Sequence, residues 1–135
     1  MTIRTRPMSA AAVQQRAQQA RAFMAIADLA LSDLSTAGQT NVAGSNAVLA
    51  GIAAADAICG RTLGQRSASD NHTDGGTLLK QATPPSSQAA TNLKKLLVSK
   101  TDTQYSPDLV SLAVARRLVV AAQRLLDEME KALRA

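Results

Sequence analysis

Residues 44–72 read GSNAVLAGIAAADAICGRTLGQRSASDNH, and the first part of this stretch decides the fold. Its apolar residues cover almost every side of a helix, which is typical of a helix surrounded by other helices. Asp56 is the exception. A carboxylate buried alone is costly, so we expect a donor or a cation from a neighbouring helix beside it. We therefore predict a central helix over about 41–63.

Two amphipathic segments, 9–34 and about 106–135, lie at the two ends of the chain. In both, apolar residues recur at alternating spacings of four and three, which places them on one seam of a helix. The seams are Val13, Ala17, Ala20, Met24, Ala27, Leu31 and Leu34, and Leu112, Ala115, Val119, Ala122, Leu126, Met129 and Leu133. Two such helices around an apolar one predict an antiparallel bundle.

A third arm, interrupted near Pro84-Pro85, connects the central and final helices. Residues 64–76 are the most polar part of the chain and are typical of a loop that leads into a helix. We predict a short helix over about 72–82 and a second helical piece after the prolines. We predict no strand. We expect Gly38 to end the first helix. The expected first residues of the later helices are Asn41 or Ser45 for the central helix, Asp70 or Asn71 for the short helix, Ser86 or Ser87 for the piece after the prolines, and Ser106, with Pro107 and Asp108, for the final helix.

The fold class that these patterns predict is all-α, an antiparallel four- to five-helix bundle. We expect residues 1–8 to form a flexible arm and residues 9–135 a single domain. The chain has one Phe, one Tyr and no Trp among 135 residues, so its core is built from small and aliphatic side chains. An Ala-rich core buries little area per residue, and we expect a homodimer to supply the rest.

The formal net charge of +5 indicates either a solvated cationic surface or attraction to phosphate polyanions. The near absence of aromatic rings argues against a general single-strand binder that stacks bases. One Cys, one His and scattered carboxylates make no ligand cluster, so we expect no metal and no cofactor. We expect Cys59 to be a buried hydrophobe.

The N-terminal residues carry positive charges without the apolar block of a secretion signal. We find no uninterrupted apolar segment of membrane-spanning length. We therefore expect a soluble cytoplasmic protein with no membrane contact.

The segment from Arg66 to His72 is the one that suggests chemistry. A guanidinium can hold a phosphate and stabilise charge in a transition state, and an imidazole can take or give a proton near neutral pH. Cleavage of RNA without a metal needs both functions. Asp56 would orient either group. A loop histidine that only caps or solvates the third arm is the alternative interpretation.

Four further residues are candidate contacts for nucleic acid. Lys100 and Tyr105 precede the final helix, where a base could stack on the ring; alternatively, the ring plugs the end of the bundle. Arg116 and Arg117 would follow a phosphate track on the final helix, or belong to a solvated face with the acids that come later in it.

The chain resembles the HEPN family (higher eukaryotes and prokaryotes nucleotide-binding domains), in particular its small actinobacterial members. The matching pieces are SNAVLAGIAAADAIC, the DNH that opens the third arm with LL shortly after it, and LKKLLVSKTDTQYSPDLVSLAVARRLVVAAQRLLDEM. The resemblance implies a four- or five-helix bundle. For active members it implies metal-independent ribonucleases whose Arg and His, four to six residues apart, meet across a dimer cleft.

Arg66 and His72 fit this spacing, although Ser67 stands where the family usually has Asn, Asp or His, and the family motif commonly lies on the final helix. Many HEPN-like proteins are not nucleases and serve as antitoxins, scaffolds or substrate-binding partners. We therefore expect a bacterial protein that binds or cleaves RNA in a toxin–antitoxin or defence system. The alternatives are a non-catalytic protein that dimerises or binds a protein partner, and a small-ligand pocket around Asp56.

Overall fold

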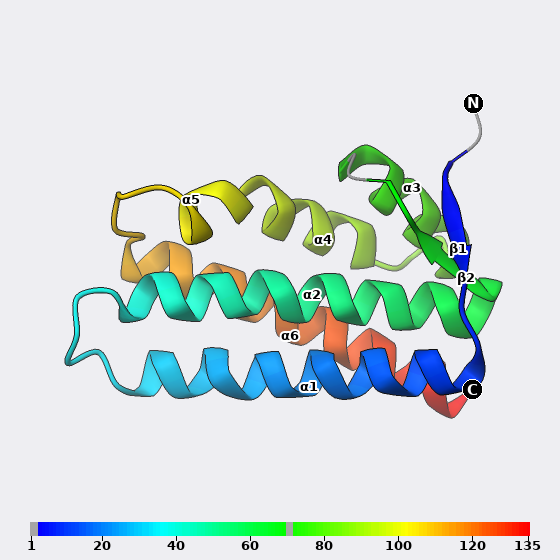
Figure 1. The fold of residues 1–135 in the computed structure, drawn as a ribbon, viewed down its shortest axis with the longest axis horizontal. Coiled ribbons are helices and arrows are strands. Elements are labelled where there is room, and N and C mark those ends of the chain that lie inside the picture. The colour runs from blue at the N-terminus through cyan, green and yellow to red at the C-terminus, as the bar shows by residue number, and fades with distance from the viewer. Residues whose placement is uncertain (1–2, 70–71) are drawn as a thin grey trace.

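The computed structural model of the chain describes residues 3–69 and 72–135, apart from the side chain of His72. Within them, four helices run alternately in opposite directions: α1 (Ala10–Ser32), α2 (Gln39–Leu63), α4 (Ala89–Val98) and α6 (Leu112–Arg134) (Figure 1). The short helices α3 (His72–Ala82) and α5 (Lys100–Gln104) lie before and after α4. The strands β1 (Thr5–Pro7) and β2 (Gln65–Ser67) pair at one end of the bundle (Figure 1). The predicted all-α bundle is confirmed.

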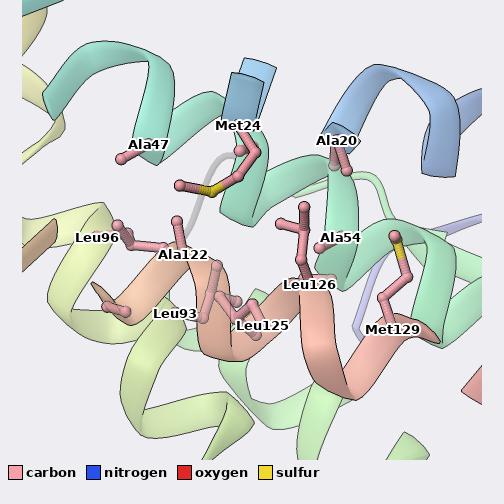
Figure 2. Packing of buried hydrophobic residues seen from close by; sticks show 14 of the residues in the cluster. Ala20, Met24, Ala47, Ala54, Leu93, Leu96, Ala122, Leu125, Leu126 and Met129 are labelled. Carbon is pink, nitrogen blue, oxygen red and sulfur yellow. The ribbon is translucent and has the colours of Figure 1, made fainter. Parts of the chain in front are cut away.

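Helix α2 is the centre of the fold, because it contacts α1, α6, α3, α4 and α5. More than half of the buried hydrophobic residues among those described are alanines, so the helix axes approach closely. The larger side chains come mainly from α4 and α6. Figure 2 shows both kinds together: Ala20, Ala47 and Ala54 from α1 and α2, and Leu93, Leu96, Leu125, Leu126 and Met129 from α4 and α6.

Helix α2 is also long and apolar enough to cross a membrane by length and composition, the one such helix among the described residues. The helix is not an uninterrupted apolar segment, because it contains Asp56. Moreover, 67% of its most apolar window is buried inside the bundle. This is the pattern of a core helix in a soluble protein.

Several helix ends agree with the predictions. The Ser9 hydroxyl accepts a hydrogen bond from the Ala12 N–H at 3.1 Å and caps α1. Helix α3 has the predicted bounds, and the third arm is interrupted at the two prolines. The N-cap of α4 is Gln88, one residue after the predicted Ser86 or Ser87, and the Ser87 hydroxyl accepts from the Ala89 N–H at 3.1 Å beside it. Asp70 and Asn71, the predicted caps of α3, lie outside the described residues.

Other helix ends differ from the predictions. Gly38 immediately precedes α2 instead of ending α1. Neither Asn41 nor Ser45 caps α2, since that helix already begins at Gln39. The side chain of Asn41 is used at longer range: it accepts from the Val110 N–H at 2.9 Å and donates to the Asp108 carbonyl at 3.1 Å.

The start of the final helix is also displaced from the prediction. Ser106 forms a turn, in which its hydroxyl accepts from the Asp108 N–H at 3.2 Å. Ser111 caps α6 instead, accepting from the Val114 N–H at 3.1 Å. The two hydrogen bonds of Asn41 are made to the non-helical segment between Ser106 and Ser111. The short helix α5 was not predicted.

The prediction that the chain has no strand is wrong. Residues 5–7, expected in a loose arm, pair with residues 65–67 in an antiparallel register that sets Arg6 opposite Arg66. Gly64 makes this pairing accessible, because its left-handed conformation (φ 72°) turns the chain as α2 ends. The Met8 N–H donates to the Gly64 carbonyl at 2.9 Å and closes the sheet at that end.

Candidate functional site

An open cleft of about 420 Å³ lies where β1, β2, α2, α4 and the start of α5 meet. One part of its wall is apolar, and another part carries charges. The apolar side chains are Ile52, Ala55, Cys59, Leu93 and Leu97. The charged ones are Arg6, Arg16, Asp56, Arg66 and Lys100. A cleft of this size and mixed lining is suited to a small ligand or to one segment of a polymer.

Asp56, the single carboxylate among the described residues of the cleft wall, pairs with Arg16 of α1. The Arg16 Nε donates to Asp56 Oδ2 at 2.9 Å, and the two side chains are 27% and 17% exposed. Arg16 Nη1 also donates to Gln19 Oε1 at 2.6 Å, which fixes the guanidinium. The predicted partner of Asp56 from a neighbouring helix is thus confirmed.

Burial raises the pKa of Asp56 above its usual value of 3.8. The charge of Arg16, its hydrogen bond and the more distant charge of Arg66 lower the pKa but do not cancel the effect of burial. The carboxylate is therefore already matched to Arg16. Within the described residues, no carboxylate forms an ion pair with Arg6, Arg66 or Lys100.

The sheet brings two of these cations face to face. Arg6 and Arg66 occupy directly opposite positions on β1 and β2, and both border the cleft. Like charges at such positions repel one another. Arg66 Nη1 donates to the Ser67 carbonyl at 3.2 Å, and neither arginine forms an ion pair within the described residues. Lys100, at the start of α5, adds a third cation to the same wall.

His72, the predicted acid or base, begins α3. Its side chain lies outside the described residues, so its distance from Arg66 is not described. Helix α3 contacts β2, and Gly75 in the first turn of α3 borders the cleft. The first turn of α3 therefore borders the same cleft as Arg66.

The remaining predicted contacts are not in the cleft. The ring of Tyr105 follows α5 and is 73% exposed, so the interpretation that it plugs the end of the bundle is wrong. Arg116 and Arg117 line a different groove, between α4 and α6. Among the predicted site residues whose side chains are described, only Asp56, Arg66 and Lys100 come together.

Sequence analysis missed Arg6 and Arg16. The need of Asp56 for a cation was recognised, but the identity of that cation depends on the register of α1 against α2. Arg6 had no signal in the sequence, because its position depends on a strand pairing across about sixty residues, for which local periodicity carries no information.

Cys59 borders the cleft but is only 4% exposed. Burial, and to a smaller extent the charge of Asp56, raises the pKa of its thiol to about 12. The thiolate is the reactive form, so Cys59 is not a nucleophile at neutral pH. Among the described residues, no three His, Cys, Asp or Glu side chains gather as metal ligands would.

Comparison of the chain with protein-family models, with curated proteins and with solved structures finds no match in any of the three. The resemblance to the HEPN family stays a hypothesis. Function is therefore argued from the cleft.

Proposed function

We propose that the chain is an HEPN-like RNA-binding protein that holds the phosphate backbone of RNA in this cleft. The observation that carries the proposal is the opposed pair Arg6 and Arg66, with Lys100 on the same wall and no ion pair to any of the three within the described residues. A phosphate between the two guanidinium groups would replace their repulsion with attraction to both. A cleft with this excess of positive charge attracts polyanions.

The types of side chain suit a phosphate backbone more than a base sequence. A guanidinium donates two parallel hydrogen bonds to one phosphate, and the lysine acts as a compact charge. The apolar side chains opposite can contact a ribose or the edge of a base. No aromatic ring lines this cleft among the described residues, so bases have no surface to stack on. We expect binding with little sequence preference.

Cleavage is the catalytic form of the same proposal. Arg66 would hold the scissile phosphate while the ribose 2′-oxygen attacks phosphorus and the 5′-oxygen leaves. His72 would take the proton of the 2′-hydroxyl or give one to the departing oxygen. Arg66 would also stabilise the additional negative charge of the transition state. A homodimer, supported by the small side chains of the core, would bring two such clefts together in a toxin–antitoxin or defence setting.

The binding test uses a fluorescently labelled, unstructured RNA and measures anisotropy over a range of salt concentrations. Three cations that each release about 0.7 of a counterion from a single strand predict a slope of log K against log [salt] of about −2. Arg66→Ala and Lys100→Ala should each reduce that slope by about 0.7. Lys94→Ala, a change at an exposed lysine of α4 outside the cleft, is the control. Identical slopes for all three variants would refute the site.

The cleavage test incubates the same RNA with the protein and EDTA. His72→Ala and Arg66→Ala should abolish the appearance of products that end in a cyclic phosphate. If the His72 variant cleaves as fast as the wild-type protein, the catalytic assignment fails. RNA binding by Arg66 and Lys100 would be unaffected by that result, because the salt slope measures it separately.

A second candidate function is the binding of a small anionic molecule. The volume of about 420 Å³ falls within the usual range of small-ligand sites, and the cavity borders Asp56 as that alternative requires. A mononucleotide would then bind with a salt slope corresponding to one phosphate and would displace RNA completely at saturation. A non-catalytic role through dimerisation is tested by measuring the mass of the protein in solution.

A further inference from the structure

A second concave surface lies on the other face of α4. This groove, between α4 and α6, has a volume of about 560 Å³. Leu93 and Leu97 of α4 face the cleft described above, whereas Lys95 and Val98 of the same helix face the groove. The two surfaces are therefore separate, and a variant in one can leave the other unchanged.

The groove is apolar along its length. Val98 and Val120 are 65% and 48% exposed. Val114, Leu118 and Ala121 of α6 continue the apolar lining. A valine on the exposed face of a helix neither favours the helix nor gains from burial. A contiguous group of such residues is typical of an interaction site.

The edge of the groove is cationic without exception among the described residues. Its charged residues are Lys95, Arg116, Arg117 and Arg124. All four are exposed, and none has an ion pair or side-chain hydrogen bond within the described chain.

The arginines of the groove are exposed, as the sequence-based alternative of a solvated face expects, but within the described residues none of them forms an ion pair with an acid of α6. Glu130 pairs with Arg21 of α1 at 2.6 Å, and Asp127 accepts from Gln123 at 3.0 Å. Within the described residues, no carboxylate forms an ion pair with a cation at the edge of the groove.

We infer that this groove binds an amphipathic helix of another protein, with an apolar stripe flanked by Asp and Glu. The stripe covers the two exposed valines, and the flanking carboxylates pair with the arginines of α6. Helices that dock in grooves use apolar residues spaced three and four apart in this way. A second copy of the chain is a poor occupant, because two cationic edges would face each other. An RNA would match the cations but not the valines.

The test uses the full chain and three synthetic helical peptides. The first has leucines at i, i+3, i+4 and i+7 with glutamates beside them, the second has the same composition scrambled, and the third has lysines in place of the glutamates. Fluorescence anisotropy should show the first peptide binding at least about tenfold more tightly than either of the others. Equal binding of the scrambled peptide would overturn the inference, since it would mean attraction by charge alone.

Variants locate the binding surface. Val120→Ser and Arg117→Glu should each weaken the binding of the first peptide by about tenfold or more. Two matched controls lie outside the groove: Val42→Ser, at a valine of α2 that is 40% exposed, and Lys94→Glu on α4. Circular dichroism verifies that each variant is folded. Unchanged binding by Val120→Ser would overturn the inference. The inference would also be overturned if Val120→Ser dissociated a dimer of the chain, or if it reduced RNA binding as much as peptide binding. Each result would assign the groove to another occupant.

Discussion

Replacing Gly60 by alanine tests the packing that connects the bundle to the sheet. Gly60 is buried in the last turn of α2, where residues 8–13 cross it. A Cβ at this position would lie 2.7 Å from Met8 Sδ and 2.7 Å from Val13 Cγ2. Both distances are well below van der Waals contact. Met8 follows β1 directly, so a displacement there also moves the strand that carries Arg6.

The expected loss of stability follows from two opposing effects. Extra volume in a packed core costs about 1–3 kcal/mol, because neighbouring side chains leave their preferred rotamers. Alanine recovers up to about 1 kcal/mol over glycine inside a helix. Val13 is β-branched and buried and cannot easily move away, so the cost should exceed the gain. We expect the free energy of unfolding to decrease by about 1–2 kcal/mol, which lowers Tm by roughly 3–8 °C in a chain of this length.

Thermal and urea unfolding followed by far-UV circular dichroism measures this effect. Gly76→Ala in α3 is the matched control, because a Cβ there meets nothing within 4 Å and the variant should be as stable as the wild type or more stable. In a Val13→Ala background, the Gly60 substitution should cost clearly less than in the wild type. A Gly60 variant that is as stable as the Gly76 variant would refute the packing argument. The packing argument would also be refuted if the losses of stability caused by Val13→Ala and Gly60→Ala simply added in the double variant.

Three other predictions test single contacts. Asp56→Asn keeps an acceptor for Arg16 and removes a carboxylate whose pKa burial raises. The folded wild type holds that proton more tightly than the unfolded chain does, so its stability decreases as the pH rises from about 4 through the raised pKa. In urea unfolding, the free energy of unfolding of the variant should therefore increase relative to that of the wild type as the pH rises above about 4. A difference that does not change with pH would contradict this prediction. Cys59 should not react with a thiol reagent at about pH 8 until urea unfolds the chain, because the thiolate is scarce and buried; rapid labelling of the native protein would contradict its burial. Asn41→Ala leaves the Val110 N–H without its acceptor and should cost about 1–3 kcal/mol; a change below about 0.5 kcal/mol would show that the contact is dispensable.

The sequence by itself determined the helical class and most of its elements. The alternating spacings of α1 and α6, and the bounds of α3, follow from local patterns of apolar residues, which the helix converts directly into a buried face. The need of Asp56 for a partner was also determined locally, because the cost of burying a lone charge does not depend on which helix supplies the cation.

Only the tertiary structure decided which side chains meet. Arg16 faces Asp56 because of the register of α1 on α2, and Arg6 faces Arg66 because the end of α2 turns at Gly64 into a strand that pairs across about sixty residues. Neither contact leaves a local pattern, since each depends on the geometry of segments distant in the chain. The same reason separates Arg116 and Arg117 from the cleft: α4 stands between the two surfaces, and each takes its charges from a different set of elements.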